Sequence, residues 1–520
     1  MNVKNTNNDG QLPKETESYW IKSTEMKSFP QLKNDIEVEV AIIGGGITGI
    51  TTAYALIKEG FKVAIFEASS VLNGTTGHTT AKITAQHGLI YDELIQHFGK
   101  EKARLYYEAN LNAAKYIENN IDLHGIECEY RKEDAYLYTT SSDYLADLEK
   151  EAEAYRKLGI DGEYTESIPL DLNVKAAVIM KNQAQFHPLQ YVTRLLDYIK
   201  ENGGEIYENS VATRMEDGNP AIVHFKNESK VTAKYVISSS HFPFHDGRGY
   251  FARMHPERSY VIAAKPEKTF PGGMYINAEQ PTRSIRSVTI NGEEFLLFSG
   301  DGHKTGQGKV EMKHYEALEK FAKENFDTKN ILYRWSAQDL VTVDKVPYIG
   351  KISAGHENIF IATGFRKWGM TTSTVAALLI TDLIIGKANP YEDLYTPSRF
   401  VVDPSIKEII KENVNVAANL IGGKLERPDK ELKDIKEGEG SVVTIKGARA
   451  GAYKTETGEL FVVDTTCTHM GCEVNWNGGD KTWDCPCHGS RFSFEGEVME
   501  GPAARPLKKI DPNSIDYTKS

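Results

Sequence analysis

The sequence predicts an α/β domain built on a βαβ unit, an α+β region inserted into it, and a small all-β domain at the C-terminus. Three observations support this fold class. A strand, a glycine turn, a helix and a second strand follow one another between residues 39 and 67. From about residue 185 to 345, strands and helices mix without a simple βα repeat. From residue 441 onward, short strands and glycine turns dominate.

Composition narrows the class of protein. The chain has 520 residues and a formal net charge of −12, so non-specific binding to nucleic acid or to an anionic membrane is disfavoured. No run of roughly 20 apolar residues is present, and the N-terminus is polar without an apolar signal segment. We expect no transmembrane segment and a cytoplasmic location, and a peripheral contact with the membrane stays open.

The N-terminal unit indicates dinucleotide binding. After a polar lead-in of residues 1–37, the glycines Gly44, Gly46 and Gly49 follow a strand and open a helix with G-x-G-x-x-G spacing. This spacing suits a tight turn, close approach to a pyrophosphate, and packing of helix on strand. Glu67 ends the second strand, where a carboxylate would hold a ribose hydroxyl. The fingerprint alone does not separate FAD from NAD.

Cysteine placement indicates a metal site near the C-terminus. Four of the five cysteines lie between residues 467 and 487, and only Cys128, which we interpret as a plain buried thiol, lies elsewhere. Each of two short boxes supplies one cysteine and one histidine. Two Cys and two His from paired loops are the ligands of a Rieske-type [2Fe–2S] cluster. A structural zinc site is the alternative, but it would leave two cysteines without a role. The predicted ligands are Cys467, His469, Cys485 and His488.

Residues 441 to 512 resemble a Rieske domain, in the branch found in quinol-oxidising cytochrome complexes. The resemblance implies a disulfide between Cys472 and Cys487 and a proline loop beginning at Gly501. That branch has a Ser and a Tyr after the second box that donate hydrogen bonds to the sulfurs. Ser490 matches the first, but Phe492 replaces the Tyr. Loss of one donor predicts a potential in the middle of the Rieske range of about −150 to +300 mV.

Residues 37 to 390 resemble the D-amino-acid-oxidase-type FAD-dependent oxidoreductases, which include glycine oxidase, sarcosine dehydrogenase and γ-glutamylputrescine oxidase. Three segments carry the resemblance: the fingerprint with Glu67, residues 74–81, and residues 364–373. It implies a Rossmann-like FAD-binding domain with an inserted substrate domain. Related dehydrogenases bond flavin covalently through a His in a segment like that ending at His78. The implied FAD-binding residues are Gly44, Gly46, Gly49, Glu67, Thr75, Thr76, His78, Val211, Gly364, Trp368, Gly369, Met370 and Thr371.

A linker separates the two predicted domains, residues 38–396 and 441–520. Within residues 397–440, a helix carries Ile406, Ile410, Val414, Ala417 and Ile421 on one face. We interpret it as a helix that packs on its own protein, and a helix lying on a membrane surface is the alternative.

The combination of cofactors predicts the function. Flavin accepts two electrons from an amine, whereas a [2Fe–2S] cluster carries one at a time. We expect an FAD-dependent dehydrogenase or oxidase of an amino acid or secondary amine, with the cluster passing electrons to a quinone, cytochrome or small redox protein. The alternatives are a reductase running in the opposite direction and a redox sensor without turnover. The glycine-rich stretch 300–308 is interpreted as a substrate-domain loop. Candidates for binding or positioning substrate are Arg366, Lys367, Arg286 and Tyr260, then Arg253, Arg258 and His303.

Overall fold

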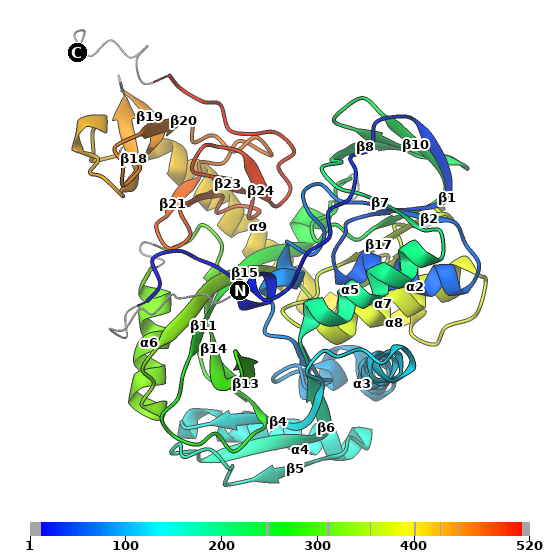
Figure 1. Cartoon of the computed structure of the whole chain (residues 1–520). Helices are drawn as coiled ribbons and strands as arrows, with labels where there is room; N and C mark the ends of the chain where they lie inside the picture. The colour runs from blue at the N-terminus through cyan, green and yellow to red at the C-terminus, as the bar shows by residue number, and fades with distance from the viewer. Residues whose placement is uncertain are drawn as a thin grey trace.

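The computed structural model describes residues 12–245, 249–308, 312–353, 355–399, 402–426, 428–445 and 447–511. Two large sheets form the body of the molecule, and the C-terminal domain lies against that body as a separate lobe, coloured orange to red in Figure 1. Two short helices are α1 (Tyr19–Lys22), which buries Tyr19 and Trp20, and α8 (Glu392–Tyr395).

The first sheet is the dinucleotide-binding sheet expected from the N-terminal unit. Its order is β16-β17-β10-β1-β2-β7, with five neighbouring strands parallel from β17 to β7 and a β8–β9 hairpin added beside β10. Helices α2, α5 and α7 lie together beside this sheet (Figure 1). The bounds are β1 Ile36–Ile43, α2 Ile47–Lys58, β2 Val63–Phe66, α5 Pro188–Glu201, β7 Glu205–Tyr207, β8 Ala212–Glu216, β9 Ala221–Phe225, β10 Lys230–Ser238, β16 Tyr348–Lys351, β17 Ile359–Thr363 and α7 Gly369–Ile384.

The second sheet is the inserted α+β region. Its order is β15-β11-β14-β13-β12-β4-β6-β3, with β5 paired to β6. Helix α3 (Tyr91–His124) is kinked at Gly99, a residue with non-helical backbone angles. The other bounds are β3 Lys82–Ile83, β4 Arg131–Thr139, α4 Leu145–Leu158, β5 Gly162–Thr165, β6 Ala176–Gln185, β11 Met254–Ala264, β12 Met274–Asn277, β13 Arg283–Ile290, β14 Glu293–Lys304, α6 Met312–Phe326 and β15 Ile331–Thr342.

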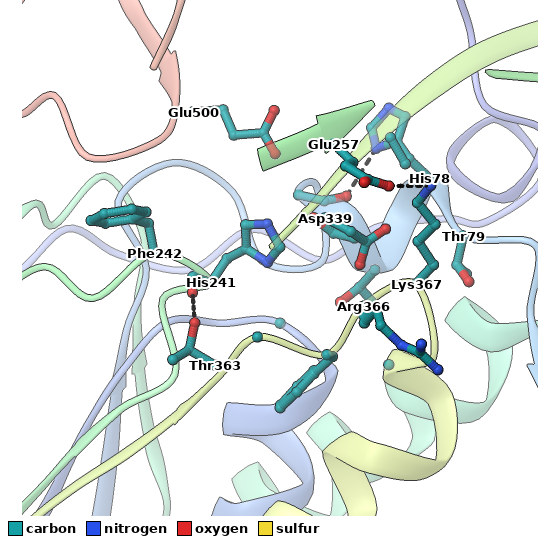
Figure 2. A pocket seen from close by; sticks show the side chains of 18 of the residues that line it. His78, Thr79, His241, Phe242, Glu257, Asp339, Thr363, Arg366, Lys367 and Glu500 are labelled. Carbon is teal, nitrogen blue, oxygen red and sulfur yellow. Dashed lines mark hydrogen bonds and ion pairs between the residues drawn. The ribbon is translucent and has the colours of Figure 1, made fainter. Parts of the chain in front are cut away.

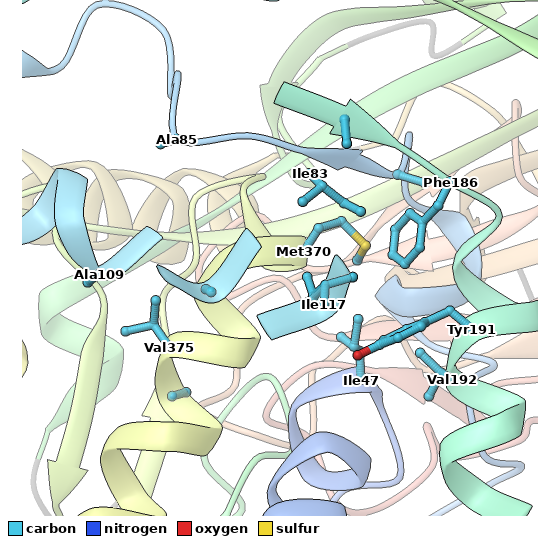
Figure 3. Packing of buried hydrophobic residues seen from close by; sticks show 14 of the residues in the cluster. Ile47, Ile83, Ala85, Ala109, Ile117, Phe186, Tyr191, Val192, Met370 and Val375 are labelled. Carbon is cyan, nitrogen blue, oxygen red and sulfur yellow. The ribbon is translucent and has the colours of Figure 1, made fainter. Parts of the chain in front are cut away.

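One hydrophobic core joins the two sheets. Ile47 at the start of α2, Ile117 from α3, Tyr191 from α5 and Met370 from α7 pack together with Phe186 (Figure 3). Burial of these side chains removes apolar surface from water and stabilises the packing by roughly 1.5–3 kcal/mol for each large side chain. The core therefore holds the dinucleotide-binding helix and the substrate sheet in a fixed relation.

The C-terminal domain consists of two small antiparallel sheets, as predicted. Strands β18, β19 and β20 form one sheet, and β21 to β24 form the other. The bounds are β18 Gly440–Ile445, β19 Ala448–Lys454, β20 Leu460–Val463, β21 Asn475–Asn477, β22 Thr482–Asp484, β23 Arg491–Ser493 and β24 Val498–Glu500. The predicted fold class is confirmed.

The linker helix, α9 (Val402–Leu425), exists, but it packs through a different face from the one expected. Ile410, Val414 and Ile421 are 59%, 62% and 61% exposed, so the apolar face points to solvent. Val416 and Leu420 contact the C-terminal domain instead. The expectation that the apolar stripe packs on the protein was wrong, because the body presents polar groups to this helix; the side chain of Ile406 lies outside the described residues. Among the described helices, none combines the length and the apolar character needed to cross a bilayer.

Candidate functional site

The glycine turn between β1 and α2 opens a cavity of about 1000 Å³. Gly49 lies so close to the turn that a Cβ atom there would be 2.1 Å from the Gly44 carbonyl oxygen, so a larger residue would force the helix away from the strand. The first turn of α2 faces the cavity, where its N–H groups favour a bound phosphate. The local structure is therefore the phosphate-binding turn expected from the sequence.

Glu67 lies at the end of β2 and lines the same cavity. Its carboxylate accepts hydrogen bonds from the backbone N–H of Gly45 at 2.8 Å and of Ser69 at 2.9 Å. Burial raises the pKa of Glu67, and this effect outweighs the hydrogen bonds, which lower it. Val211 lines the cavity beside it, and its carbonyl accepts from the Lys226 N–H at 2.9 Å. Glu67 and Val211, both predicted to bind FAD, therefore line the same cavity.

The segment from Thr75 to His78 lines the middle of the cavity. The Thr76 hydroxyl accepts a hydrogen bond from the Ile47 N–H at 3.0 Å, and the Thr75 hydroxyl donates to the Gln338 carbonyl at 3.1 Å. His78 Nδ1 lies 2.9 Å from the Gly74 carbonyl oxygen. Burial lowers the pKa of His78, which favours the neutral form of its ring.

The loop that joins β17 to α7 closes the opposite end. Gly364, Trp368, Gly369 and Met370 line the cavity there, and the Trp368 ring stacks on His87 with ring centroids 4.8 Å apart. Thr371 is buried and donates to the Thr84 carbonyl at 3.1 Å. One cavity thus joins all three segments, and its volume and lining groups fit FAD.

Lys82 is a site residue that sequence reasoning missed. It lies in β3, lines the cavity, and donates hydrogen bonds to the Tyr275 carbonyl at 3.2 Å and to the Ser284 hydroxyl. Within the described parts of the chain no carboxylate pairs with it. Burial, with the nearby Arg286, lowers the pKa of Lys82 to about 7. A single lysine in a two-residue strand carries no sequence signal of this role.

The predicted substrate-binding residues are divided by the fold. Arg366, Lys367 and His303 line the cavity. Lys367 forms an ion pair with Glu257 at 2.8 Å (Figure 2), and Arg366 donates to the His87 carbonyl at 2.9 Å.

The other four candidates do not reach the cavity. Arg286 is buried and donates to the backbone carbonyls of Thr80 and Ala81. The Tyr260 hydroxyl is 2.9 Å from His303 Nε2, Arg253 stacks on the Tyr250 ring, and Arg258 lies at the boundary with the C-terminal domain.

The predicted cluster ligands lie on two neighbouring loops of the C-terminal domain. Cys467 and His469 follow β20, and Cys485 and His488 follow β22. The His469 and His488 rings have centroids 5.0 Å apart. A hydrogen bond from Cys485 lowers the pKa of Cys467, and hydrogen bonds from the loop N–H groups and the Ser490 hydroxyl add to this effect. The lower pKa favours the thiolate, which is the form that binds metal.

Cys472 and Cys487 form a disulfide, as the family resemblance implied. Cys467 and Cys485 remain as buried free thiols. His488 Nδ1 is buried and has no hydrogen-bond partner among the described residues, so this atom is available as a ligand. Two thiols and two imidazoles on two neighbouring loops are a ligand set that fits a [2Fe–2S] cluster.

The histidine side of the cluster site faces the flavin-binding body. The Phe251 ring centroid lies 5.4 Å from His488 and 6.3 Å from His469, and the Phe242 centroid lies 6.2 Å from His469. Phe242 also lines the flavin cavity, three residues beyond the backbone of Ser239 that packs against Gly44.

The proline loop of the C-terminal domain lines that cavity as well. Gly501, Pro502 and Ala503 belong to its wall, with Glu500 before them. Figure 2 shows Glu500 on the same side of the cavity as Phe242 and His241. The two cofactor sites therefore share a wall.

Buried charges and backbone contacts hold the domains together. Arg258 Nη2 lies 3.3 Å from Glu500 and its Nη1 3.5 Å from Asp480, while Arg491 contacts the same two carboxylates and Asp484. Gln338 donates to the Gly489 carbonyl at 2.9 Å.

The glycine-rich stretch 300–308, expected to be a substrate-domain loop, is part strand and part loop. Residues 300–304 belong to β14, and the residues after them contact the C-terminal domain. Asn475 Nδ2 donates to the Gly306 carbonyl at 3.0 Å, and Gln307 Nε2 to the Pro486 carbonyl at 3.0 Å. The sequence contained no signal for these contacts.

Comparison with known proteins supports both sites. Residues 39–383 match the family model described as FAD dependent oxidoreductase, and residues 427–511 match the Rieske [2Fe-2S] domain. The chain is 54% identical to the putative Rieske 2Fe-2S iron-sulfur protein YhfW of Bacillus subtilis, over 95% of this chain and 97% of that protein. It is 24% identical to γ-glutamylputrescine oxidoreductase of Escherichia coli, over 73% of this chain and 92% of that protein. The structure of glycine oxidase from Geobacillus kaustophilus superposes with a TM-score of 0.60 and 17% identity, covering 70% of this chain and 99% of that chain.

Proposed function

Because the chain belongs to the FAD dependent oxidoreductase family and ends in a Rieske [2Fe–2S] domain, we propose that it dehydrogenates an amino acid or secondary amine and passes the electrons singly through the cluster to an external acceptor. FAD supplies two-electron chemistry and the cluster supplies one-electron chemistry when they are bound. The observation that carries the proposal is the shared wall between the two sites. Phe242 contacts a cluster ligand on one side and lines the flavin cavity on the other.

The protein's own contribution to electron transfer is to hold these sites at a fixed separation. Two buried arginines and three buried or half-buried carboxylates lie at the domain boundary, where their attraction is screened less than at the surface. The aromatic contacts of Phe251 and Phe242 with the cluster histidines are part of the same boundary. Such a boundary favours transfer within one docked arrangement.

For the substrate, we propose that Lys82 binds a carboxylate. A buried ammonium without a protein counter-ion is costly, and a substrate carboxylate would offset that cost. Two of the three ammonium donors are occupied by Tyr275 and Ser284, which leaves one to face the cavity. Lys82 would thereby orient the substrate's α-carbon toward the flavin. Arg366 and Lys367 remain candidates for positioning the other end of the substrate, and His78 remains the candidate for covalent attachment of FAD.

Anaerobic mixing of the holoprotein with a library of amines and amino acids tests the proposal. A substrate bleaches the flavin absorbance near about 450 nm and then reduces the cluster. Amino acids should bleach faster than the matched amines that lack a carboxylate. If nothing in the library bleaches the flavin, the dehydrogenase function is refuted. A reductase acting in the opposite direction would instead show flavin reduction only after a reduced carrier has filled the cluster.

The sensor alternative depends on access to the disulfide. Cys472 and Cys487 are 2% and 4% exposed, and α9 covers Cys487, whose Sγ lies 3.8 Å from the Val416 carbonyl oxygen. Thiol–disulfide exchange needs an attacking thiolate to reach a sulfur atom. This burial favours a structural disulfide.

A further inference from the structure

The outer face of helix α9 is an exposed apolar stripe, formed by Ile410, Val414, Ala417, Ile421 and Leu425. Ile410, Val414 and Ile421 are each about three-fifths exposed, and Leu425 is 75% exposed. At 1.5 Å per residue the stripe is about 22 Å long. A contiguous apolar surface of this kind on a solvent-exposed face normally marks an interaction site.

The charges on α9 are arranged asymmetrically about the stripe. At 100° per residue, Lys411 and Lys424 project on its two sides, and both are exposed. The described acidic side chains project away from it. Glu412 is buried and forms an ion pair with Lys304 of the body; Glu426, just past the helix, pairs with Arg449 of the C-terminal domain at 3.3 Å; and Glu408 pairs with Lys411 at 3.1 Å. The stripe is therefore bordered by Lys424 on one side and by Lys411, in its ion pair with Glu408, on the other.

The inner face of α9 covers the cluster loops. Val416 and Leu420 pack in the same hydrophobic cluster as the four C-terminal cysteines, and a Cβ on Gly423 would lie 3.0 Å from the Glu473 side chain in the first loop. The exposed stripe is therefore only about one helix diameter, roughly 10 Å, from the Cys472–Cys487 disulfide. The histidine side of the cluster is closed by Phe251 and Phe242. The stripe consequently lies on the face of α9 that is turned away from the cluster loops.

We propose that α9 docks the protein on a membrane surface that contains anionic lipid. An apolar stripe bordered by lysines is the arrangement of helices that lie in the plane of the lipid interface. The stripe inserts among the acyl chains, and Lys411 and Lys424 meet the anionic headgroups. In that orientation the cluster loops packed under α9 lie about one helix diameter from the lipid, so the acceptor of the proposed dehydrogenase is a molecule held in or at the lipid. The role as an electron outlet rests on the proposed function; the membrane binding does not.

The test is co-sedimentation of the full-length holoprotein with vesicles. We compare vesicles of phosphatidylcholine and phosphatidylglycerol with vesicles of phosphatidylcholine alone. The wild type should partition onto the mixed vesicles and less onto the neutral ones. Val414→Glu and Ile421→Glu should each reduce the partition coefficient at least about tenfold, because each places a charge in the apolar layer. Leu123→Glu is the matched control, since Leu123 is 66% exposed on α3 and should leave partitioning unchanged.

All outcomes are decisive. Unchanged flavin and cluster absorbance in the α9 variants shows that they fold, as expected for exposed positions. Absence of wild-type partitioning, or equal partitioning of Val414→Glu and wild type, overturns the proposal. A dimer in light scattering that dissociates with Val414→Glu, without vesicle binding, assigns the stripe to a second copy and also overturns it. If amines fail to bleach the flavin while the vesicle result holds, the proposed function fails and the docking surface stands.

Discussion

Substitution of Arg258 by Met removes a cation that is buried at the domain boundary. Arg258 is fully buried and its guanidinium lies 2.6 Å from the Ser336 hydroxyl, 3.3 Å from Glu500, 3.5 Å from Asp480 and 3.9 Å from Asp484. Removing one partner of a buried pair costs about 3–5 kcal/mol, because a charge is left uncompensated. Arg491 still contacts all three carboxylates within 3.4 Å, so we expect a loss near the lower end, about 3 kcal/mol.

Two measurements test the predicted loss of stability at the domain boundary. Urea denaturation, followed by the visible circular dichroism of the cluster, gives the free energy of docking and unfolding of the C-terminal domain. Stopped-flow absorbance separates flavin reduction from cluster reduction, and we expect Arg258→Met to slow the second while the first keeps its rate. Lys265→Met is the matched control, because Lys265 forms a partly exposed pair with Glu293 at 2.8 Å whose loss costs at most about 1 kcal/mol. If the two variants behave alike in both assays, the buried charges do not hold the domains together and the reasoning is refuted.

Three further predictions concern the cofactors and the substrate. Phe492→Tyr should raise the cluster potential in a redox titration, because a hydroxyl at this buried position would donate to the sulfurs and stabilise the reduced cluster. An unchanged potential would show that a missing donor at residue 492 does not set the potential. A small carboxylate such as acetate should bind at Lys82 and perturb the flavin spectrum. Burial lowers the pKa of Lys82 to about 7, and only the charged form of Lys82 attracts an anion. The affinity should therefore be constant below pH 7 and fall about tenfold per pH unit above it. Lys82→Met should abolish both the affinity and its pH dependence, and a pH-independent wild type would exclude the assigned role. Acid precipitation should leave flavin in the pellet if His78 is the attachment point, and flavin found only in the supernatant excludes the bond.

Local spacing predicted a dinucleotide site and a cluster site, and the family resemblance identified the dinucleotide as FAD. The Gly44 to Gly49 turn and the two cluster boxes each span only a few residues, so the chemistry that they need is written within one loop. The disulfide between Cys472 and Cys487 was likewise expected from the family resemblance, and its partners are 15 residues apart. The element types and the all-β character of the C-terminal domain also followed from short-range patterns.

The tertiary structure decided which residues meet across the two domains. Arg258, a candidate for binding substrate, contacts Asp480, which is 222 residues away in the chain. Lys82 acquired its place in the cavity only because β3 joins the edge of the substrate sheet beside β6. Helix α9 was predicted, but its apolar face points outward because Glu412 and its neighbours contact polar groups of the body. Such contacts depend on how complete domains pack, and residue spacing along one segment holds no information about the surface that segment will meet.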